Sequence, residues 1–240
     1  MIDKNSPLPI YYQLEEEIRN LIHSGQLAPG EKLPSEKEYV ERYSISRMTV
    51  RQAITNLVLE GLIVRQKGKG TFVAEKKYEQ TLKGITSFSE DMRARGLEPS
   101  TTLISFGEES ADTFVANKLN IGPGDSVFKI YRLRLANQSP LAIETVYTPR
   151  KIVGDMTKKD FTASFYDYIE RELPYKIEYG EQEIEAAIAN ETELKYLKLS
   201  AGSPVLLIQR LTYLSNKAPF EYVRTVYRGD KYKFTINMKR

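Results

Sequence analysis

The stretch that most constrains this chain is residues 46–61, where apolar side chains recur at spacings of three and four. This period predicts one buried stripe along a helix, because a strand would instead alternate every second residue. The stripe is formed by Val50, Ala53, Ile54, Leu57 and Val58. Ser46 can cap the start of the helix, and Gly61 suits the left-handed residue that often ends one. We therefore expect a helix between Ser46 and Gly61 that packs one face against a core.

The other face of this helix is polar in its first two turns. Its side chains are Arg47, Thr49, Arg51 and Gln52. They gain little from burial but can reach phosphates and base edges. The charge distribution agrees, since residues 42–77 hold eight basic and two acidic side chains, whereas residues 1–41 hold four basic and eight acidic ones. Such local concentration of positive charge is typical of a module that binds a phosphate backbone.

The preceding segments complete a helix-turn-helix pattern. Pro9 opens a first helical period, which ends near Gly25. Ser35 and Glu38 then have the S-x-x-E spacing of a capping box, which predicts a short helix with Tyr39 on its buried side. Two helices joined by a short turn, the second bearing exposed arginines, are typical of DNA-binding helix-turn-helix units.

A predicted hairpin follows the basic helix. Two short β-prone runs, Leu62–Arg65 and Thr71–Val73, flank the glycine- and lysine-rich segment 66–70. A Gly-Lys hairpin tip taken alone is usually just solvated. Because this one comes directly after a basic helix, we interpret it as the wing of a winged helix, whose lysines attract phosphates.

These motifs, in this order, resemble the winged-helix domain of GntR-family bacterial transcription regulators. The resemblance covers about residues 8–75 and is carried by the runs 33–36, 46–53, 57–61 and 67–73. It implies that DNA is contacted by the capping-box helix, the first turns of the recognition helix and the wing tip. The residues so implicated are Ser35, Lys37, Arg47, Thr49, Arg51, Lys67 and Gly68.

Arginine is the side chain best suited to the O6 and N7 atoms of guanine, and a good bidentate contact contributes about 1–3 kcal/mol of discrimination. Arg47 and Arg51 lie one turn apart, so either could read a base while the other holds a phosphate. An ion pair of Arg51 with Glu36 or Glu60 is the competing interpretation. Many family members have arginine where this chain has Lys37, which keeps a phosphate contact but weakens a bidentate reading of guanine.

The sequence divides into a DNA-binding domain over residues 1–75, a charged linker over 76–85 and a second domain over 86–240. The second domain is strand-rich, with turn signals between neighbouring strands. Strands are expected at Thr102–Phe106, Val127–Ala136, Leu141–Tyr147, Lys176–Ala187, Val205–Leu214, Phe220–Arg228 and Tyr232–Met238, and helices at 87–95, 112–119, 165–172 and 191–199. The predicted fold class is α+β, with helices around a mainly antiparallel sheet.

One expected strand carries two arginines on its apolar face. Arg132 and Arg134 lie on the same face of this strand as Phe128 and Ile130. Because they are two residues apart, the two arginines lie about 6–7 Å from one another. Two guanidinium groups so placed repel one another unless an anion lies between them. Either a bound ligand supplies that anion, or a neighbouring carboxylate such as Glu144 does.

The second domain resembles the UTRA effector domain of the HutC subfamily, which shares the fold of chorismate lyase. The resemblance is carried by residues 86–92, 131–136, 142–144, 165–170 and 227–230, and is closest to regulators of N-acetylglucosamine utilisation. It implies a hexosamine phosphate effector, with the phosphate held by Ser87, Phe88, Ser89, Arg132 and Arg134 and the sugar surrounded by Glu144, Tyr166 and Tyr227. Trehalose phosphate and fructosamine phosphate sensors have similar patterns, so these effectors stay open as alternatives.

A helix N-terminus near Ser87 would also present free N–H groups to a phosphate. Glu90 and Asp91 weaken this argument, because acidic residues in the first turn already satisfy the helix dipole.

Together these patterns predict a repressor controlled by a small anionic effector. A homodimer, joined through the second domain, would place two recognition helices on a near-palindromic operator. The effector must bind the DNA-competent and incompetent arrangements with different affinity, since equal affinity would shift nothing. The segment around residues 76–95 joins linker to pocket and is expected to carry the change.

An enzyme of chorismate-lyase-like fold and a non-specific architectural DNA binder are the alternatives. The chain has no cysteine and one histidine, which argues against nucleophilic or acid–base catalysis and against a metal site, and we predict no catalytic residue, metal or cofactor. With no apolar run near 18 residues and no apolar leader, we expect a cytoplasmic protein without membrane contact.

Overall fold

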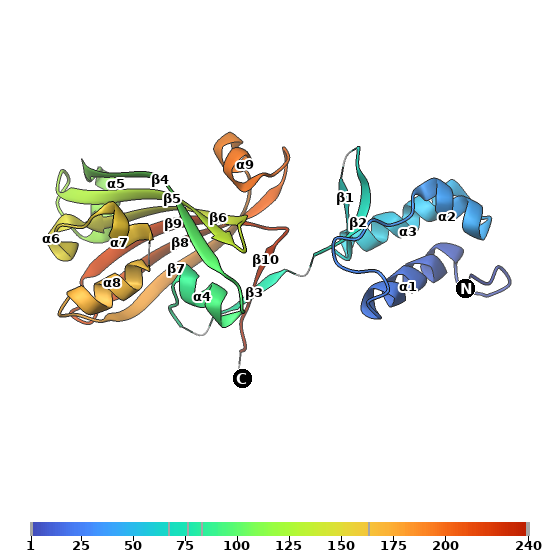
Figure 1. The fold of residues 1–240 in the computed structure, drawn as a ribbon, viewed down its shortest axis with the longest axis horizontal. Coiled ribbons are helices and arrows are strands. Elements are labelled where there is room, and N and C mark those ends of the chain that lie inside the picture. Colours follow the sequence, from blue (N-terminus) through green and yellow to red (C-terminus); the bar gives the residue numbers. More distant parts are fainter. Residues whose placement is uncertain (1, 67, 76, 83, 163, 239–240) are drawn as a thin grey trace. The chain divides into compact units, whose positions relative to one another are not determined.

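The computed structural model describes residues 2–66, 68–75, 77–82, 84–162 and 164–238. It forms two compact units, Met1–Lys76 and Lys77–Arg240 (Figure 1). Each unit is described below by itself.

The N-terminal unit contains three helices and a hairpin. These are α1 (Ile10–His23), α2 (Glu36–Tyr43), α3 (Arg47–Leu59), β1 (Ile63–Gln66) and β2 (Gly70–Val73). The capping box that starts α2 is present, because the Ser35 side chain accepts the N–H of Glu38 while the Glu38 carboxylate accepts the N–H of Ser35. Ser46 caps α3 in the same way through the N–H of Thr49. The expected helix-turn-helix and hairpin are confirmed.

The apolar stripe of α3 forms the centre of this unit. Val50, Ala53, Ile54 and Leu57 are all at most 1% exposed, and they pack with Leu14 of α1. Burying one such aliphatic side chain contributes about 1.5–3 kcal/mol, so the stripe fixes which face of α3 is turned away from solvent. The polar side chains of its first two turns are thereby left outside.

The C-terminal unit is built on a six-stranded antiparallel sheet with strand order β4-β5-β6-β9-β8-β7. The strands are β4 (Pro99–Ser110), β5 (Ser126–Ala136), β6 (Ser139–Pro149), β7 (Ile177–Ile188), β8 (Pro204–Leu214) and β9 (Pro219–Arg228). The expectation of an α+β fold with a mainly antiparallel sheet is confirmed. The strands β4 and β6 run further than expected at both ends, because residues that lack apolar alternation still pair in the ladder, whereas β5 and β7 lie within one residue of the predicted bounds.

Helices pack on both faces of this sheet (Figure 1). On one face lie α4 (Phe88–Ala94), α6 (Arg150–Val153), α7 (Lys158–Thr162) and α8 (Phe165–Glu172), and on the other α5 (Thr113–Leu119) and α9 (Glu191–Leu197). The sequence did not predict α6 and α7. Each has at most five residues, too few to show a helical period. Every helix in the described ranges is too short or too polar to cross a membrane.

The expected linker contains a strand. Residues Tyr78–Thr81 form β3, which pairs in parallel with β10 (Tyr232–Thr235). Gln80 is 5% exposed and accepts a hydrogen bond of 3.0 Å from the hydroxyl of Tyr232. The segment predicted as a charged linker over residues 76–85 therefore includes a short strand that the sequence did not predict. The charged composition concealed a strand whose partner lies about 150 residues further along the chain.

Candidate functional sites

The polar face of α3 is exposed, as expected. The side chain of Arg47 is 75% exposed and that of Arg51 is 52% exposed. Thr49 is half-buried, and its hydroxyl lies 2.8 Å from that of Ser46, at the N-cap. The first two turns of α3 thus present two extended cations and a hydroxyl to solvent, the chemistry that binds phosphates and base edges.

Both arginines also lie near one carboxylate. Glu36 on α2 is 3.6 Å from Arg47 Nε and 3.8 Å from Arg51 Nε. The competing ion pair of Arg51 with Glu36 is therefore present, whereas Glu60 pairs with Arg19 at 2.8 Å. Exposed ion pairs contribute only about 0–1 kcal/mol, so this contact leaves the guanidinium groups available to a stronger anion.

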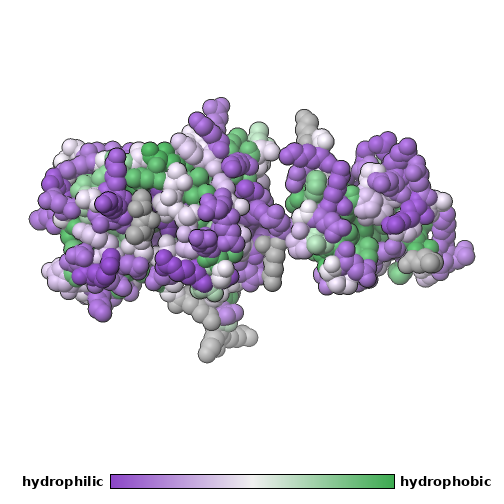
Figure 2. Space-filling model, viewed as in Figure 1, coloured by the Kyte–Doolittle hydropathy of each residue, from purple (hydrophilic) through white to green (hydrophobic). Residues whose placement is uncertain are grey.

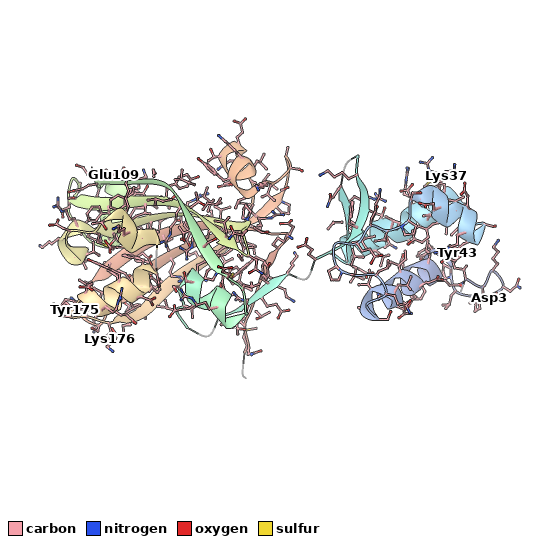
Figure 3. The ribbon with its side chains drawn as sticks, viewed as in Figure 1. Asp3, Lys37, Tyr43, Glu109, Tyr175 and Lys176 are labelled. Atoms are coloured by element: carbon pink, nitrogen blue, oxygen red, sulfur yellow. The ribbon has the colours of Figure 1, made fainter. Side chains whose placement is uncertain are left out.

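The other residues expected to contact DNA differ in whether their polar groups are already bound within the protein. The hydroxyl of Ser35 is engaged in the capping box, so its main role in this structure is to start α2. Lys37 projects outward from α2 (Figure 3), 3.7 Å from Glu41, and the surface over this helix is mainly hydrophilic (Figure 2). Gly68 is exposed at the hairpin tip with a φ of +74°. Lys67 lies outside the described residues.

The C-terminal unit encloses a polar cavity of about 40 Å³ between α4, α8 and one face of the sheet. All eight residues that the UTRA resemblance implicated line this cavity. They are Ser87, Phe88 and Ser89 of the α4 segment, Arg132 and Arg134 of β5, Glu144 of β6, Tyr166 of α8 and Tyr227 of β9. Five elements, spread from residue 87 to residue 227, thus bring the expected side chains together.

Arg132 is paired within the protein. Its Nε donates a 2.7 Å hydrogen bond to Glu144, the residue opposite it on β6, and its Nη1 donates to the carbonyl of Phe161 at 3.0 Å. Burial alone would raise the pKa of the Glu144 carboxyl, but the guanidinium groups of Arg132 and Arg134 lower this pKa below its usual value. The ion-pair interpretation is therefore correct for Arg132, which also lines the cavity.

Arg134 is less well compensated. It is 2% exposed, and among the described residues its Nε has no hydrogen-bond partner, although Glu144 lies 3.7 Å away. Its other nitrogens donate to the hydroxyls of Thr101 at 2.7 Å and Ser89 at 3.1 Å, and its guanidinium lies 4.5 Å from the ring centre of Phe88. Burial, together with the nearby Arg132, lowers the pKa of Arg134 to about 10. A buried cation in this state favours a bound anion.

The N-terminus of α4 is already capped. Ser87 accepts the N–H of Glu90, and the Glu90 carboxylate accepts the N–H of Ser87. The expectation that this helix end would present free N–H groups is weakened accordingly. Ser89, the second residue of α4, is 6% exposed and accepts from Arg134, so its hydroxyl is the α4 group directed toward the buried cation.

Two charged residues of the cavity wall, Arg210 of β8 and Glu221 of β9, were not predicted from the sequence. Glu221 is 3% exposed and accepts hydrogen bonds from Tyr166 at 2.9 Å and Thr212 at 3.0 Å. Burial raises the pKa of its carboxyl. Arg210 donates to Gln182 at 2.9 Å and to the carbonyl of Thr86 at 3.2 Å. Charged residues at inward positions of two otherwise apolar strands were the signal that could have identified them.

The last expected residue, Tyr227, closes the cavity from β9. It is 6% exposed, and its ring centre lies 4.3 Å from that of Tyr232 on β10. The cavity as a whole offers guanidinium groups, carboxylates and hydroxyls. This set suits a small ligand with an anionic group and several hydroxyls.

Within the described ranges, no group of three or more acidic or histidine side chains is arranged to hold a metal ion.

Comparison with known proteins gives independent results for the two units. Residues 10–73 match the family model of bacterial regulatory proteins of the gntR family, and residues 94–233 match the UTRA domain model. The HTH-type transcriptional repressor NagR of Bacillus subtilis is 47% identical over 239 residues, covering 100% of this chain and 98% of that protein. A histidine utilization repressor of Pseudomonas putida is 33% identical, covering 95% and 91%. The crystal structure of PhnF from Mycobacterium smegmatis aligns with a TM-score of 0.65 at 26% identity, covering 95% and 98%.

Proposed function

Because this chain belongs to the GntR family and is a DNA-binding transcriptional repressor of the HutC type, we propose that a small anionic metabolite, a sugar phosphate, controls its binding to operator DNA. The relatives are regulators, and the chain is a regulator rather than an enzyme. A repressor of bacterial genes acts in the cytoplasm.

The observation that carries the proposal is the state of Arg134. A guanidinium buried in a polar cavity, with one N–H unpaired and a pKa lowered to about 10, is destabilised as a cation. A phosphate entering beside it would accept the free N–H and restore the lost solvation through charge-assisted hydrogen bonds. The Ser89 hydroxyl, which accepts from Arg134, would donate its own O–H to the phosphate.

The rest of the cavity supports a sugar attached to that phosphate. Glu144 and Glu221 offer carboxylate oxygens that can accept from sugar hydroxyls or an amino group, and Tyr166 offers a phenol. The resemblance to regulators of N-acetylglucosamine utilisation favours N-acetylglucosamine 6-phosphate or glucosamine 6-phosphate. Trehalose 6-phosphate and fructosamine phosphates present the same two chemical groups and are the alternatives.

The size of the cavity supports a coupled conformational change. About 40 Å³ holds one or two water molecules, whereas ligand pockets usually measure roughly 300–1,000 Å³. The proposed binding of a sugar phosphate therefore includes movement of part of the cavity wall. Residues 86–89 and Asp91 form one side of the cavity and lie a few residues after β3 in the chain. We therefore propose that the segment 76–95 reorders on binding and that this change lowers operator affinity.

We further propose that the repressor binds DNA as a homodimer joined through the C-terminal unit. One winged helix reads few base pairs, so a monomer would discriminate poorly among genomic sites. Two copies related by a two-fold axis read a near-palindromic operator in successive major grooves.

The test combines a thermal-shift screen with an operator-binding assay on the full chain. A ligand present at one hundred times its Kd stabilises its receptor by about 2.7 kcal/mol, which a melting scan detects. We expect glucosamine 6-phosphate or N-acetylglucosamine 6-phosphate to raise the melting temperature and to weaken binding to a duplex selected by the protein from a random library. The unphosphorylated sugars serve as matched controls and should do neither.

Equal shifts from phosphorylated and unphosphorylated sugars would contradict the role of the cation. Operator affinity that is identical with and without a stabilising ligand would contradict the control mechanism. Replacing Ser89 with alanine should reduce the shift from the phosphorylated sugar while leaving operator binding without ligand unchanged.

A further inference from the structure

The carboxylate of Glu36 lies at the centre of three arginines that come from different parts of the N-terminal unit. It is 3.6 Å from Arg47 and 3.8 Å from Arg51, both on α3, and 3.6 Å from Arg65 on β1. The Arg65 guanidinium also lies 3.4 Å from the hydroxyl of Thr55. The half-buried carboxylate of Glu36 thus links three elements: the capping-box helix α2, the recognition helix α3 and the wing strand β1.

This arrangement is unfavourable for binding a polyanion. Glu36 places a negative charge within the face that must approach phosphates, and like charges in an interface weaken association. Its contribution to folding is small. Ion pairs with arginines that are 43–75% exposed contribute about 0–1 kcal/mol, and an acidic residue in the first turn of a helix contributes about 0.3–1 kcal/mol. The start of α2 is already stabilised by Ser35 and Glu38.

We propose that Glu36 is a positioning residue for operator discrimination, an inference that rests on the DNA-binding function. By attracting three guanidinium groups, it holds Arg47 and Arg51 in one cluster with a limited set of side-chain orientations. The acceptor atoms of a guanine that meets this cluster can replace part of the contacts between Glu36 and the arginines while the guanidinium groups stay together. Phosphates of an unrelated sequence must draw the arginines away from Glu36, and they meet its charge as well.

The experiment compares Glu36→Gln with Glu41→Gln in the full chain. Glu41 lies on the same helix and pairs with an exposed cation, Lys37, at 3.7 Å, so the control removes the same charge from the same element. Binding is measured across a series of salt concentrations to two duplexes. One is the duplex that wild-type protein selects from a random library, and the other is a shuffled duplex of equal length and composition.

For Glu36→Gln we expect tighter binding to the shuffled duplex and unchanged or weaker binding to the selected one. The ratio of the two affinities should fall roughly tenfold, the scale of one bidentate base contact. Glu41→Gln should strengthen both interactions equally and preserve the ratio. Glu36→Asp, which keeps the charge, should restore part of the discrimination.

Equal ratios for Glu36→Gln and wild type would overturn the proposal, as would a parallel loss of both affinities with a lowered melting temperature, which indicates a purely structural role. If wild-type protein selected no sequence at all, the DNA-binding function itself would fail, an outcome distinct from a preserved ratio.

Discussion

Replacing Arg134 with methionine should leave the unliganded protein nearly as stable as wild type, or more stable, while abolishing its response to sugar phosphates. Methionine keeps the unbranched shape of the side chain and removes the charge. Glu144 keeps its 2.7 Å hydrogen bond with Arg132 in the variant, so no buried carboxylate is left unpaired.

The expected magnitude follows from the position of Arg134. A pKa lowered from 12.5 to about 10 corresponds to about 3 kcal/mol of unfavourable free energy for the buried cation, at 1.36 kcal/mol per pH unit. The variant recovers this amount and loses two charge-assisted hydrogen bonds of about 1.5 kcal/mol each, to Thr101 and Ser89. The net change in unfolding free energy is expected to lie within about 1 kcal/mol of zero.

Arg132→Met is the matched comparison. Removing Arg132 leaves the buried Glu144 carboxylate 3.7 Å from its remaining cation and without the short hydrogen bond. Breaking a buried pair in this way destabilises a protein by about 3–5 kcal/mol. For a unit of this size that corresponds to a melting temperature lower by roughly 6 °C or more.

Differential scanning calorimetry of the full chain, with and without glucosamine 6-phosphate, measures both effects. Arg134→Met should melt within about 3 °C of wild type and show no ligand shift, whereas Arg132→Met should melt much lower. The reasoning is refuted if Arg134→Met is destabilised as strongly as Arg132→Met. A full ligand shift in Arg134→Met would refute the assignment of this cation to the phosphate.

Two further predictions concern pH and DNA. The folded-state pKa of the Glu221 carboxyl is raised above 4.5 and that of the Glu144 carboxyl is lowered below it. As the pH rises above 4.5, the stability of Glu221→Gln relative to wild type should therefore rise. The stability deficit of Glu144→Gln relative to wild type should instead shrink as the pH falls below about 5. Melting scans from acidic to neutral pH that show the same slope for both variants would contradict the assigned directions of the two pKa shifts. Arg51→Lys keeps the charge but not the bidentate geometry, so binding to a shuffled duplex should persist while preference for the selected duplex falls at least fivefold in a competition assay.

The N-terminal unit could be predicted closely because its signals are local. The stripe from Val50 to Leu57 has a period that only a helix satisfies, and the caps at Ser35 and Ser46 fix where two helices begin. Alternation along β5 likewise placed Arg132 and Arg134 on one face before any partner strand was known. In each case the physical cause acts over a few residues.

What the sequence did not reveal depends on contacts between distant segments. The strand β3 exists because β10 supplies its ladder, and the charged segment around it gives no local sign of pairing. Arg210 and Glu221 became part of the cavity only when β8 and β9 were placed side by side. The free N–H of Arg134 is likewise a property of packing, since sequence spacing shows a cation but not how completely its neighbours satisfy it.

The incomplete compensation of Arg134 bears on how the repressor is controlled. A ligand shifts an equilibrium only by its difference in affinity for two states, so a site already satisfied in the unliganded state gains little from a phosphate. Here the unliganded state contains the buried guanidinium of Arg134, whose hydrogen bonds are incomplete. Its hydroxyl partner Ser89 belongs to the segment that is proposed to move when a sugar phosphate binds. In the proposed mechanism, the free energy released when a phosphate accepts a hydrogen bond from Arg134 is therefore gained together with the displacement of α4. A variant that removes this buried positive charge, such as Arg134→Met, should accordingly lose its response to sugar phosphate while still binding the operator.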